Sequence, residues 1–132
     1  MAELDNHGYR ELRVFQMAYE LAMAIFRESK AFPTEERYSL TDQMRRSSRS
    51  VAANIAEGYR KRRYRNMFIS KMLDADAEAT ETQVWLAFAR DCDYMSAERH
   101  DALVARYQEV GRMLGAVVAS PEKFGSSKAS GA

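Results

Sequence analysis

Apolar residues recur through most of the chain at steps of three and four, which is the spacing of one face of an α-helix. Four segments show this pattern, at about 12–30, 39–58, 66–91 and 96–119. The connections between them are short, and short connections make consecutive long helices antiparallel neighbours. The pattern therefore predicts an all-α protein that folds as an antiparallel up-down-up-down four-helix bundle.

The same spacing predicts which residues face the core. In the first segment they are Val14, Phe15, Ala18, Leu21, Ala22, Ile25 and Ser29. In the second they are Leu40, Met44, Ser47, Ser48, Val51, Ile55 and Tyr59. The third segment has a regular heptad seam, made of Phe68, Met72, Ala75, Ala79, Thr82, Leu86 and Ala89. In the fourth they are His100, Leu103, Tyr107, Val110, Leu114 and Val117.

Capping residues suggest where the helices begin and end. Ser39 and Asp42 have the spacing of a capping box at the start of the second helix, and Gly58 suits a left-handed residue just past its end. Asn66 is the only plausible N-cap for the third helix. Ser96 is the expected N-cap of the fourth.

The two ends of the chain lack the helical pattern. Residues 1–11 and 120–132 are polar or small and aperiodic, so we expect a flexible N-terminus and a flexible C-terminal tail around one bundle domain at 12–119. The N-terminus has no apolar run that could serve as a signal sequence or membrane span, and the single cysteine, Cys92, allows no internal disulfide. These features predict a cytoplasmic protein that does not enter a membrane.

Four residues suggest contact with another subunit. Trp85 lies about a quarter turn from the heptad seam, and an indole is a typical interface anchor. Ala52, Ala53 and Ala56 lie opposite the predicted core face of the second helix, where small residues would let a second backbone approach. The alternatives are that Trp85 belongs to a widened core stripe and that the alanines are present as good helix formers.

Two polar residues near the predicted core need partners, because an unpaired buried charge or amide is costly. Asp76 lies on the flank of the third helix, and its expected partner is Arg45, Arg46 or Arg49. Asn54 lies at the edge of the core face of the second helix. We interpret both as structural contacts.

The sequence contains no recognisable catalytic pattern. A di-iron bundle requires Glu-x-x-His motifs, but Glu98 is two residues before His100, and His7 lies in the N-terminal segment. Cys92 has no CxxC partner, and no glycine-rich phosphate loop or nucleophile elbow occurs. We therefore expect no enzymatic activity, no metal and no cofactor.

Charge is concentrated in residues 45–65, RRSSRSVAANIAEGYRKRRYR, whose eight Lys and Arg against one Glu amount to +7 in a chain with a total of +1. Unopposed cations favour nucleic-acid phosphates, and interleaved tyrosines can stack on bases. The candidate phosphate contacts are Arg45, Arg46, Arg49, Arg60, Lys61, Arg62, Arg63 and Arg65, with Tyr59 and Tyr64 as candidate stackers. Alternatively, these arginines cap helix carbonyls and pair with acids of a neighbouring subunit.

Residues 32–63, FPTEERYSLTDQMRRSSRSVAANIAEGYRKR, resemble the signature of the bacterial four-helix-bundle proteins first noticed as products of intervening sequences in 23S rRNA genes. The matching features include Phe32-Pro33, the Arg45-Arg46 pair and the run NIAEG, and the similarity extends over about residues 12–118. Two departures are Ala52, where many relatives have proline, and Asp93, where many have the glycine that ends the third helix.

The resemblance implies a bundle that assembles as a homopentameric ring. A similar protein, the accessory factor of diversity-generating retroelements, implies a basic surface that contacts nucleic acid and a reverse transcriptase. The family supplies no catalytic residues. We thus predict a non-enzymatic homo-oligomeric bundle whose basic region engages RNA or DNA. The alternative is a structural or protein-interaction scaffold whose arginines serve subunit contacts.

Overall fold

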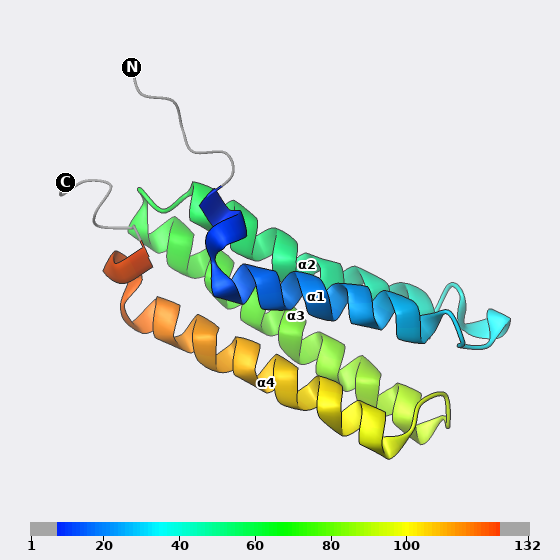
Figure 1. The fold of residues 1–132 in the computed structure, drawn as a ribbon. Helices are drawn as coiled ribbons and strands as arrows, with labels where there is room; N and C mark the ends of the chain where they lie inside the picture. The colour runs from blue at the N-terminus through cyan, green and yellow to red at the C-terminus, as the bar shows by residue number, and fades with distance from the viewer. Residues whose placement is uncertain (1–7, 125–132) are drawn as a thin grey trace.

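The computed structural model describes residues 8–124, in which four long helices lie side by side (Figure 1). They are α1 (Arg13–Ser29), α2 (Leu40–Arg60), α3 (Arg65–Asp91) and α4 (Ala97–Ala119). Three short 3₁₀ helices accompany them, η1 (Gly8–Glu11), η2 (Thr34–Glu36) and η3 (Pro121–Phe124). Among the described residues there is no strand, so the predicted all-α class is confirmed.

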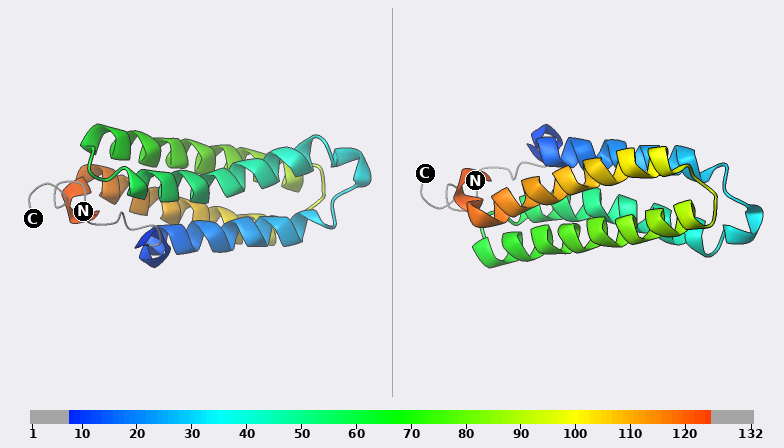
Figure 2. Two further views of the ribbon diagram at one scale, coloured as in Figure 1. Left: turned by 90° about the horizontal axis from the view of Figure 1, so that it is seen from above. Right: turned by 90° about the horizontal axis from the view of Figure 1, so that it is seen from below.

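Consecutive helices run in opposite directions, as the bundle prediction requires (Figures 1 and 2). The α2–α3 turn lies at the same end of the bundle as η1 and η3, and we call this the turn end. The α1–α2 and α3–α4 connections lie at the other end, which we call the far end. The contact between α2 and α3 is the most extensive in the bundle, and that between α1 and α4 is the least extensive of the four neighbouring pairs.

Burial follows the predicted helical faces closely. The buried residues of α3 and α4 are those that the heptad seam and the fourth segment predicted, without addition. Helix α1 differs only in that Phe15 is half-buried. Helix α2 buries Thr41, Ala52 and Gly58 in addition to the predicted residues, while Tyr59 is half-buried.

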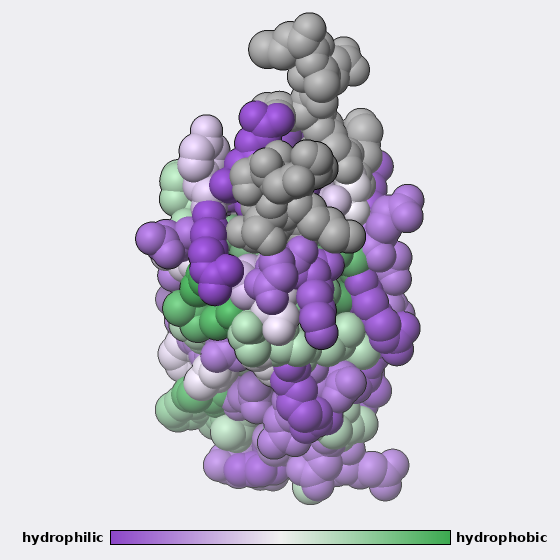
Figure 3. All heavy atoms as spheres, turned by 90° about the vertical axis from the view of Figure 1, so that its left-hand side faces the viewer, coloured by the Kyte–Doolittle hydropathy of each residue, from purple (hydrophilic) through white to green (hydrophobic). Residues whose placement is uncertain are grey.

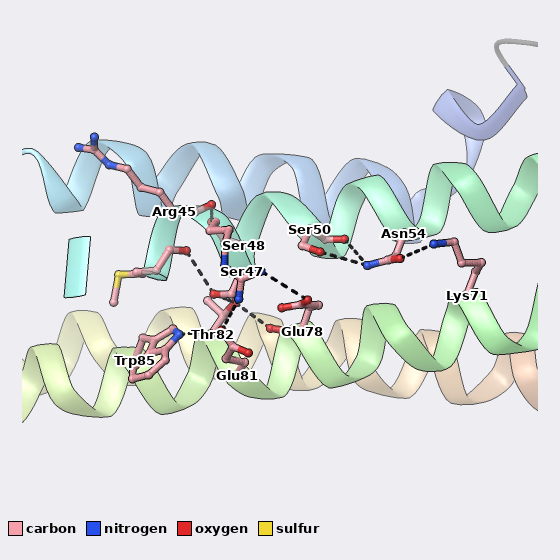
Figure 4. Close-up of polar contacts among 12 residues, drawn as sticks. Arg45, Ser47, Ser48, Ser50, Asn54, Lys71, Glu78, Glu81, Thr82 and Trp85 are labelled. Carbon is pink, nitrogen blue, oxygen red and sulfur yellow. Dashed lines mark hydrogen bonds and ion pairs between the residues drawn. The ribbon is translucent and has the colours of Figure 1, made fainter. Parts of the chain in front are cut away.

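The core between α2 and α3 contains one buried polar pair. The hydroxyls of Ser47 and Thr82 lie 2.8 Å apart, and each is also within hydrogen-bond distance of a carbonyl of its own helix (Figure 4). The nearby Tyr107 hydroxyl is fully buried and has no hydrogen-bond partner among the described residues. Burial raises the pKa of Tyr107 well above its ordinary value, so this phenol stays neutral.

The predicted end of α2 is wrong, and its predicted start is correct but lacks the predicted capping bond. Gly58 does not end α2 in a left-handed conformation, because the helix continues to Arg60. Ser39 is the N-cap of α2 but its side chain accepts no capping bond. Instead the Glu36 carboxylate accepts the Leu40 backbone N–H at 3.2 Å, so the cap comes from η2.

The other two N-termini give one correction and one confirmation. Asn66 lies inside the first turn of α3, whose N-cap is Tyr64 without a side-chain bond. Ser96 caps α4 as predicted, since its hydroxyl accepts the Arg99 backbone N–H at 3.0 Å.

Helix α3 ends in a left-handed residue that is not glycine. Asp93 has a φ of 63°. The Tyr94 N–H bonds the Ala89 carbonyl at 2.8 Å and the Asp93 N–H bonds the Arg90 carbonyl at 3.0 Å, which is the hydrogen-bond pattern of a Schellman motif. The turn therefore keeps the geometry that glycine favours even though this chain has aspartate there.

The described parts of the two predicted flexible ends contain short helices. Helix η1 packs against α1 and α2, and η3 packs against α3 and α4. His7 and the rest of residues 1–7 and 125–132 lie outside the described residues, and the flexibility of the ends stays a prediction. None of the helices in the described part combines the length and apolarity needed to cross a lipid bilayer.

Candidate nucleic-acid interface at the α2–α3 turn

The eight cations of residues 45–65 do not form one patch. Arg45, Arg46 and Arg49 lie in the first half of α2, whereas Arg60 ends that helix and the remaining four follow it. Arg45 and Arg60 are fifteen residues apart in a continuous helix, which separates them by about 22 Å along its axis at a rise of ~1.5 Å per residue. The structure thus divides the sequence cluster into two groups.

The first group makes contacts within the chain. Arg46 pairs with the carboxylates of Glu81 at 2.8 Å and Glu78 at 3.8 Å. Arg45 donates through Nε to the Ser29 hydroxyl at 2.8 Å. Arg46 is therefore matched by acids of α3 and has little charge left for a phosphate.

The second group surrounds a compact reversal of the chain, which we call the basic turn (residues 60–65). Backbone hydrogen bonds join the Lys61 N–H to the Gly58 carbonyl at 2.9 Å and the Tyr64 N–H to the Lys61 carbonyl at 2.9 Å. Arg60, Arg63, Tyr64 and Arg65 are exposed, while Lys61 and Arg62 are half-buried. Five cations in six residues are thereby concentrated at one end of the bundle.

Arg62 and Arg65 of the basic turn interact with other residues of the chain. The Arg62 guanidinium lies 4.1 Å from the centre of the Tyr59 ring and donates to the Tyr59 carbonyl at 2.9 Å. Tyr59 is half-buried, so Arg62 covers part of the ring surface that a base would need. Arg65 pairs with Glu122 of η3 at 3.7 Å, in a contact that is open to solvent.

Arg63 and Tyr64 are the most available members of the turn. Arg63 is exposed and makes no ion pair among the described residues, and the Tyr64 side chain is 63% exposed. Figure 3 views the turn end directly, and most of the surface that grey atoms leave visible is hydrophilic. Of the two candidate stacking tyrosines, the structure therefore favours Tyr64.

Glu57, the one acidic residue of residues 45–65, forms an ion pair with a cation of α3. Glu57 accepts an ion pair from Lys71 of α3 at 2.7 Å. Lys71 also donates to Asn54 Oδ1 at 3.1 Å, and the Asn54 amide donates to the Ser50 carbonyl at 2.9 Å (Figure 4). The prediction that Asn54 makes a structural polar contact is confirmed, and the partner comes from α3.

The predicted partner of Asp76 is wrong. No ion pair joins Asp76 to Arg45, Arg46 or Arg49 in the part of the chain that the structure describes. Asp76 is only half-buried and faces α4, where its Oδ1 would lie 3.5 Å from a Cβ at Gly111. Its carboxylate keeps contact with solvent, which removes the need for a cationic partner.

The structure also corrects part of the predicted subunit surface formed by Ala52, Ala53 and Ala56. Ala52 is buried within the chain at 7% exposure, so its placement opposite the core is wrong. Ala53 is exposed and Ala56 is half-buried. Together with Arg49 they line one wall of an open apolar hollow of about 420 Å³ between α1 and α2. Whether a second subunit covers this hollow stays a prediction.

Trp85 is half-buried and held at the edge of the bundle. Its indole N–H donates to Glu81 Oε2 at 3.1 Å, the carboxylate oxygen that also pairs with Arg46 (Figure 4). Its ring lies 5.8 Å from that of Phe88. The indole therefore satisfies its polar group internally and leaves an apolar side toward solvent.

A further apolar surface follows the outside of α3 and was not predicted. Leu73, Val84 and Phe88 are 52%, 47% and 53% exposed, and Ala77 between them is also exposed. At about 100° per residue these positions fall opposite the buried seam. We call them the outer α3 face. Their spacing was visible in the sequence, but the stronger inner seam had already been assigned to the core.

Metal-ligating side chains do not cluster in the described part of the chain. No group of three or more His, Cys, Asp or Glu side chains there could hold a metal ion. His100 is buried and its Nδ1 lies 2.8 Å from Asp101 Oδ1, while Cys92 is exposed at the C-cap of α3. His100 thus occupies the core-facing position that the spacing predicted.

These features define an antiparallel four-helix bundle with a cationic turn at one end and an apolar outer helix face. Comparison with known families then places it: the family described as 23S rRNA-intervening sequence protein matches residues 10–116, and the chain belongs to that family. The family description names no enzymatic activity.

One solved structure is similar over nearly its whole length. It is a protein of unknown function from the S23 ribosomal protein family of Bacteroides thetaiotaomicron, with 26% sequence identity and a TM-score of 0.73. The alignment covers 81% of this chain and 96% of that one. Among curated proteins, no match was found.

Proposed function

We propose that this protein is a non-enzymatic homo-oligomer that binds RNA or DNA through phosphate contacts of the basic turn. The observation that carries the proposal is the cluster of five cations at the turn end, in which Arg63 is exposed without an ion pair among the described residues. Binding would release the counterions condensed on the nucleic acid, which makes such contacts favourable and salt-dependent.

Tyr64 would add a contact that phosphates cannot supply. Its ring is exposed and follows Arg63 directly, so a base of an unpaired segment could stack on it while its phosphate meets the arginine. This arrangement favours single-stranded or looped nucleic acid, whose bases are free to turn outward.

Self-association would multiply a weak contact. The outer α3 face exposes the large apolar side chains of Leu73, Val84 and Phe88, and a second copy of the chain is the occupant that we propose. The resemblance to the family makes a pentamer the expected assembly. Five basic turns on one particle would give an avidity that a single turn cannot reach.

The scaffold alternative has one observation in its favour. Arg46 makes ion pairs with Glu81 and Glu78 of α3, so at least one arginine of the basic stretch already serves protein contacts. In that function the remaining arginines would pair with acids of a neighbouring subunit, and a reverse transcriptase or other protein would be the partner.

A binding titration distinguishes the two functions. A fluorescent single-stranded RNA, and the DNA of the same sequence, would be titrated with protein at several salt concentrations. We expect affinity to fall with salt, and Arg60→Gln with Arg63→Gln to reduce the slope of log K against log salt by about 1 to 2. Arg106→Gln on α4 is the charge-matched control and should leave the slope unchanged. Affinity that ignores salt, or no binding at low salt, would exclude nucleic acid as the partner.

A further inference from the structure

A second concentration of cations lies at the far end of the bundle. An open polar pocket of about 270 Å³ is formed there by the end of α1, η2 and the first turns of α2. Three cations line it, and hydroxyl side chains lie between them. The lining polar residues are Ser29, Lys30, Thr34, Arg37, Thr41 and Arg45.

The charge of this pocket is not neutralised within the described chain. Within residues 8–124, no carboxylate lies within 4.0 Å of the charged nitrogens of Lys30, Arg37 or Arg45. Of the four acids nearby in sequence, Glu28 pairs with Arg99 of α4, and Glu36 accepts bonds from the Tyr94 hydroxyl and the Leu40 N–H. The other two, Glu35 and Asp42, are exposed and form no ion pair with any described residue. Like charges held together without an acid create a positive potential that an anion relieves.

Arg45 is held in place for such an anion. Its Nε donates to the Ser29 hydroxyl at 2.8 Å, and its guanidinium lies 4.8 Å from the centre of the Phe26 ring. Figure 4 shows the Arg45 side chain pointing away from the Ser47–Thr82 pair. The Lys30 ammonium lies 4.8 Å from the same ring. The two terminal nitrogens of Arg45 make no hydrogen bond in the described structure, so a fixed pair of donors is left for a ligand.

Hydroxyl donors complete the pocket. The side chains of Thr34 and Thr41 form no hydrogen bond with any described residue, and Thr41 is only 8% exposed. Thr41 also lies in the first turn of α2, whose N-terminus carries a partial positive charge. A guanidinium fork beside hydroxyls and an ammonium is suited to a compact tetrahedral oxyanion.

We propose that this pocket binds a phosphate group, either as a free phosphate or nucleotide or as part of a nucleic-acid backbone. The site is separate from the basic turn, because the α1–α2 connection and the α2–α3 turn lie at opposite ends of the bundle (Figure 2). It does not rest on the proposed nucleic-acid function, and each can fail without the other.

Titration calorimetry of the full chain with inorganic phosphate, at constant ionic strength set by chloride, tests the site. We expect saturable binding that weakens about tenfold in Arg37→Gln, since a charge-assisted hydrogen bond is lost. Arg45→Gln should weaken it further. Arg37 is exposed, so Arg37→Gln should keep the fold. Arg45→Gln also removes the hydrogen bond to Ser29. If that loss disturbs α2, Arg37→Gln still tests the site. Arg63→Gln in the basic turn is the matched control and should bind phosphate normally.

Two results would overturn the proposal. One is the absence of saturable phosphate binding by the wild-type chain. The other is an equal loss of affinity in Arg63→Gln and Arg37→Gln, which would mean a general response to net charge.

A second arm identifies the source of the phosphate. If phosphate competes with a single-stranded oligonucleotide, and Arg37→Gln weakens the oligonucleotide as much as phosphate, the pocket takes backbone phosphates. If Arg37→Gln weakens phosphate and adenosine monophosphate but leaves the oligonucleotide unchanged, the pocket takes small phosphorylated ligands. Both results support the site.

Discussion

Gly58 of α2 faces Lys71 of α3 so closely that a Cβ atom added at position 58 would lie 3.0 Å from the Lys71 Cβ and 3.1 Å from the Met72 Cε. The glycine therefore sets how near the two helices can approach. This contact lies next to the Lys71 bridge to Glu57 and Asn54, and just before the basic turn. Because Gly58 has no side chain, α2 and α3 can approach closely beside the proposed nucleic-acid surface.

Gly58→Ala should destabilise the protein by about 1 kcal/mol, because overpacking outweighs the better helix propensity of alanine. Gly115→Ala is the matched control in α4, since a Cβ there meets nothing within 4 Å. It should stabilise by up to about 1 kcal/mol. Urea denaturation measures both, and equal stabilisation by the two variants would contradict the close contact.

Asp93→Gly should stabilise the end of α3. The residue has a φ of 63°, which costs an L-residue about 1 kcal/mol relative to glycine. The substitution also removes a negative charge from the C-terminus of the helix, where the dipole disfavours it. We expect a higher thermal midpoint by calorimetry. Asp91→Gly, at the last helical residue of α3, removes the same charge without a positive φ to relieve; it should lower the midpoint and so serves as the control.

The Tyr94 hydroxyl should control the titration of Glu36. It donates to Glu36 Oε2 at 2.8 Å, and this bond, with the Leu40 N–H, lowers the carboxyl pKa below its ordinary value. The same contact raises the pKa of Tyr94 to about 12. A depressed carboxyl pKa contributes stability above the unfolded pKa, and that contribution is lost as pH falls through the folded value.

Tyr94→Phe should therefore raise the pKa of Glu36 and reduce the loss of stability on acidification. Carbon-detected NMR titration of the Glu36 carboxyl measures the shift. Tyr38→Phe is the control, because Tyr38 is 85% exposed and its hydroxyl has no partner in the described structure. An unchanged Glu36 pKa in Tyr94→Phe would show that the backbone bond alone holds it down.

Charges on the outer α3 face should dissociate the proposed assembly. Val84→Glu and Phe88→Glu place a carboxylate on that face, and burying it against a second copy would cost several kcal/mol. Light scattering should then report particles near the chain mass of 15.1 kDa, against a multiple of it for the wild type. Ala105→Glu on the exposed side of α4 should leave the assembly intact. A wild-type chain that is monomeric at micromolar concentration would exclude self-association.

Helix positions and core faces could be predicted from spacing because they depend on local geometry. The α3 seam from Phe68 to Ala89 illustrates this, since a helix carries residues three and four apart on one face whatever it packs against. The Ser96 cap is equally local, as hydroxyl and N–H lie three residues apart.

Contacts between helices could be predicted less well from the sequence. Asp76 was expected to need an arginine of α2, but it faces Gly111 of α4. Gly58 carried a sequence signal for a helix end, yet it serves as a helix contact because α3 approaches there. The environment of each of these residues is set by a neighbour on another helix, and the sequence does not show which helix that is.

The sequence by itself determined that this chain forms four amphipathic helices with excess positive charge around residues 45–65, because periodicity and composition are properties of the chain alone. Only the tertiary structure decided that this charge is divided between the first half of α2 and the basic turn, and that Arg46 is matched by acids of α3 whereas Arg63 forms no ion pair among the described residues. The physical reason is that electrostatic interactions depend on distances in space, and helix length and packing set those distances.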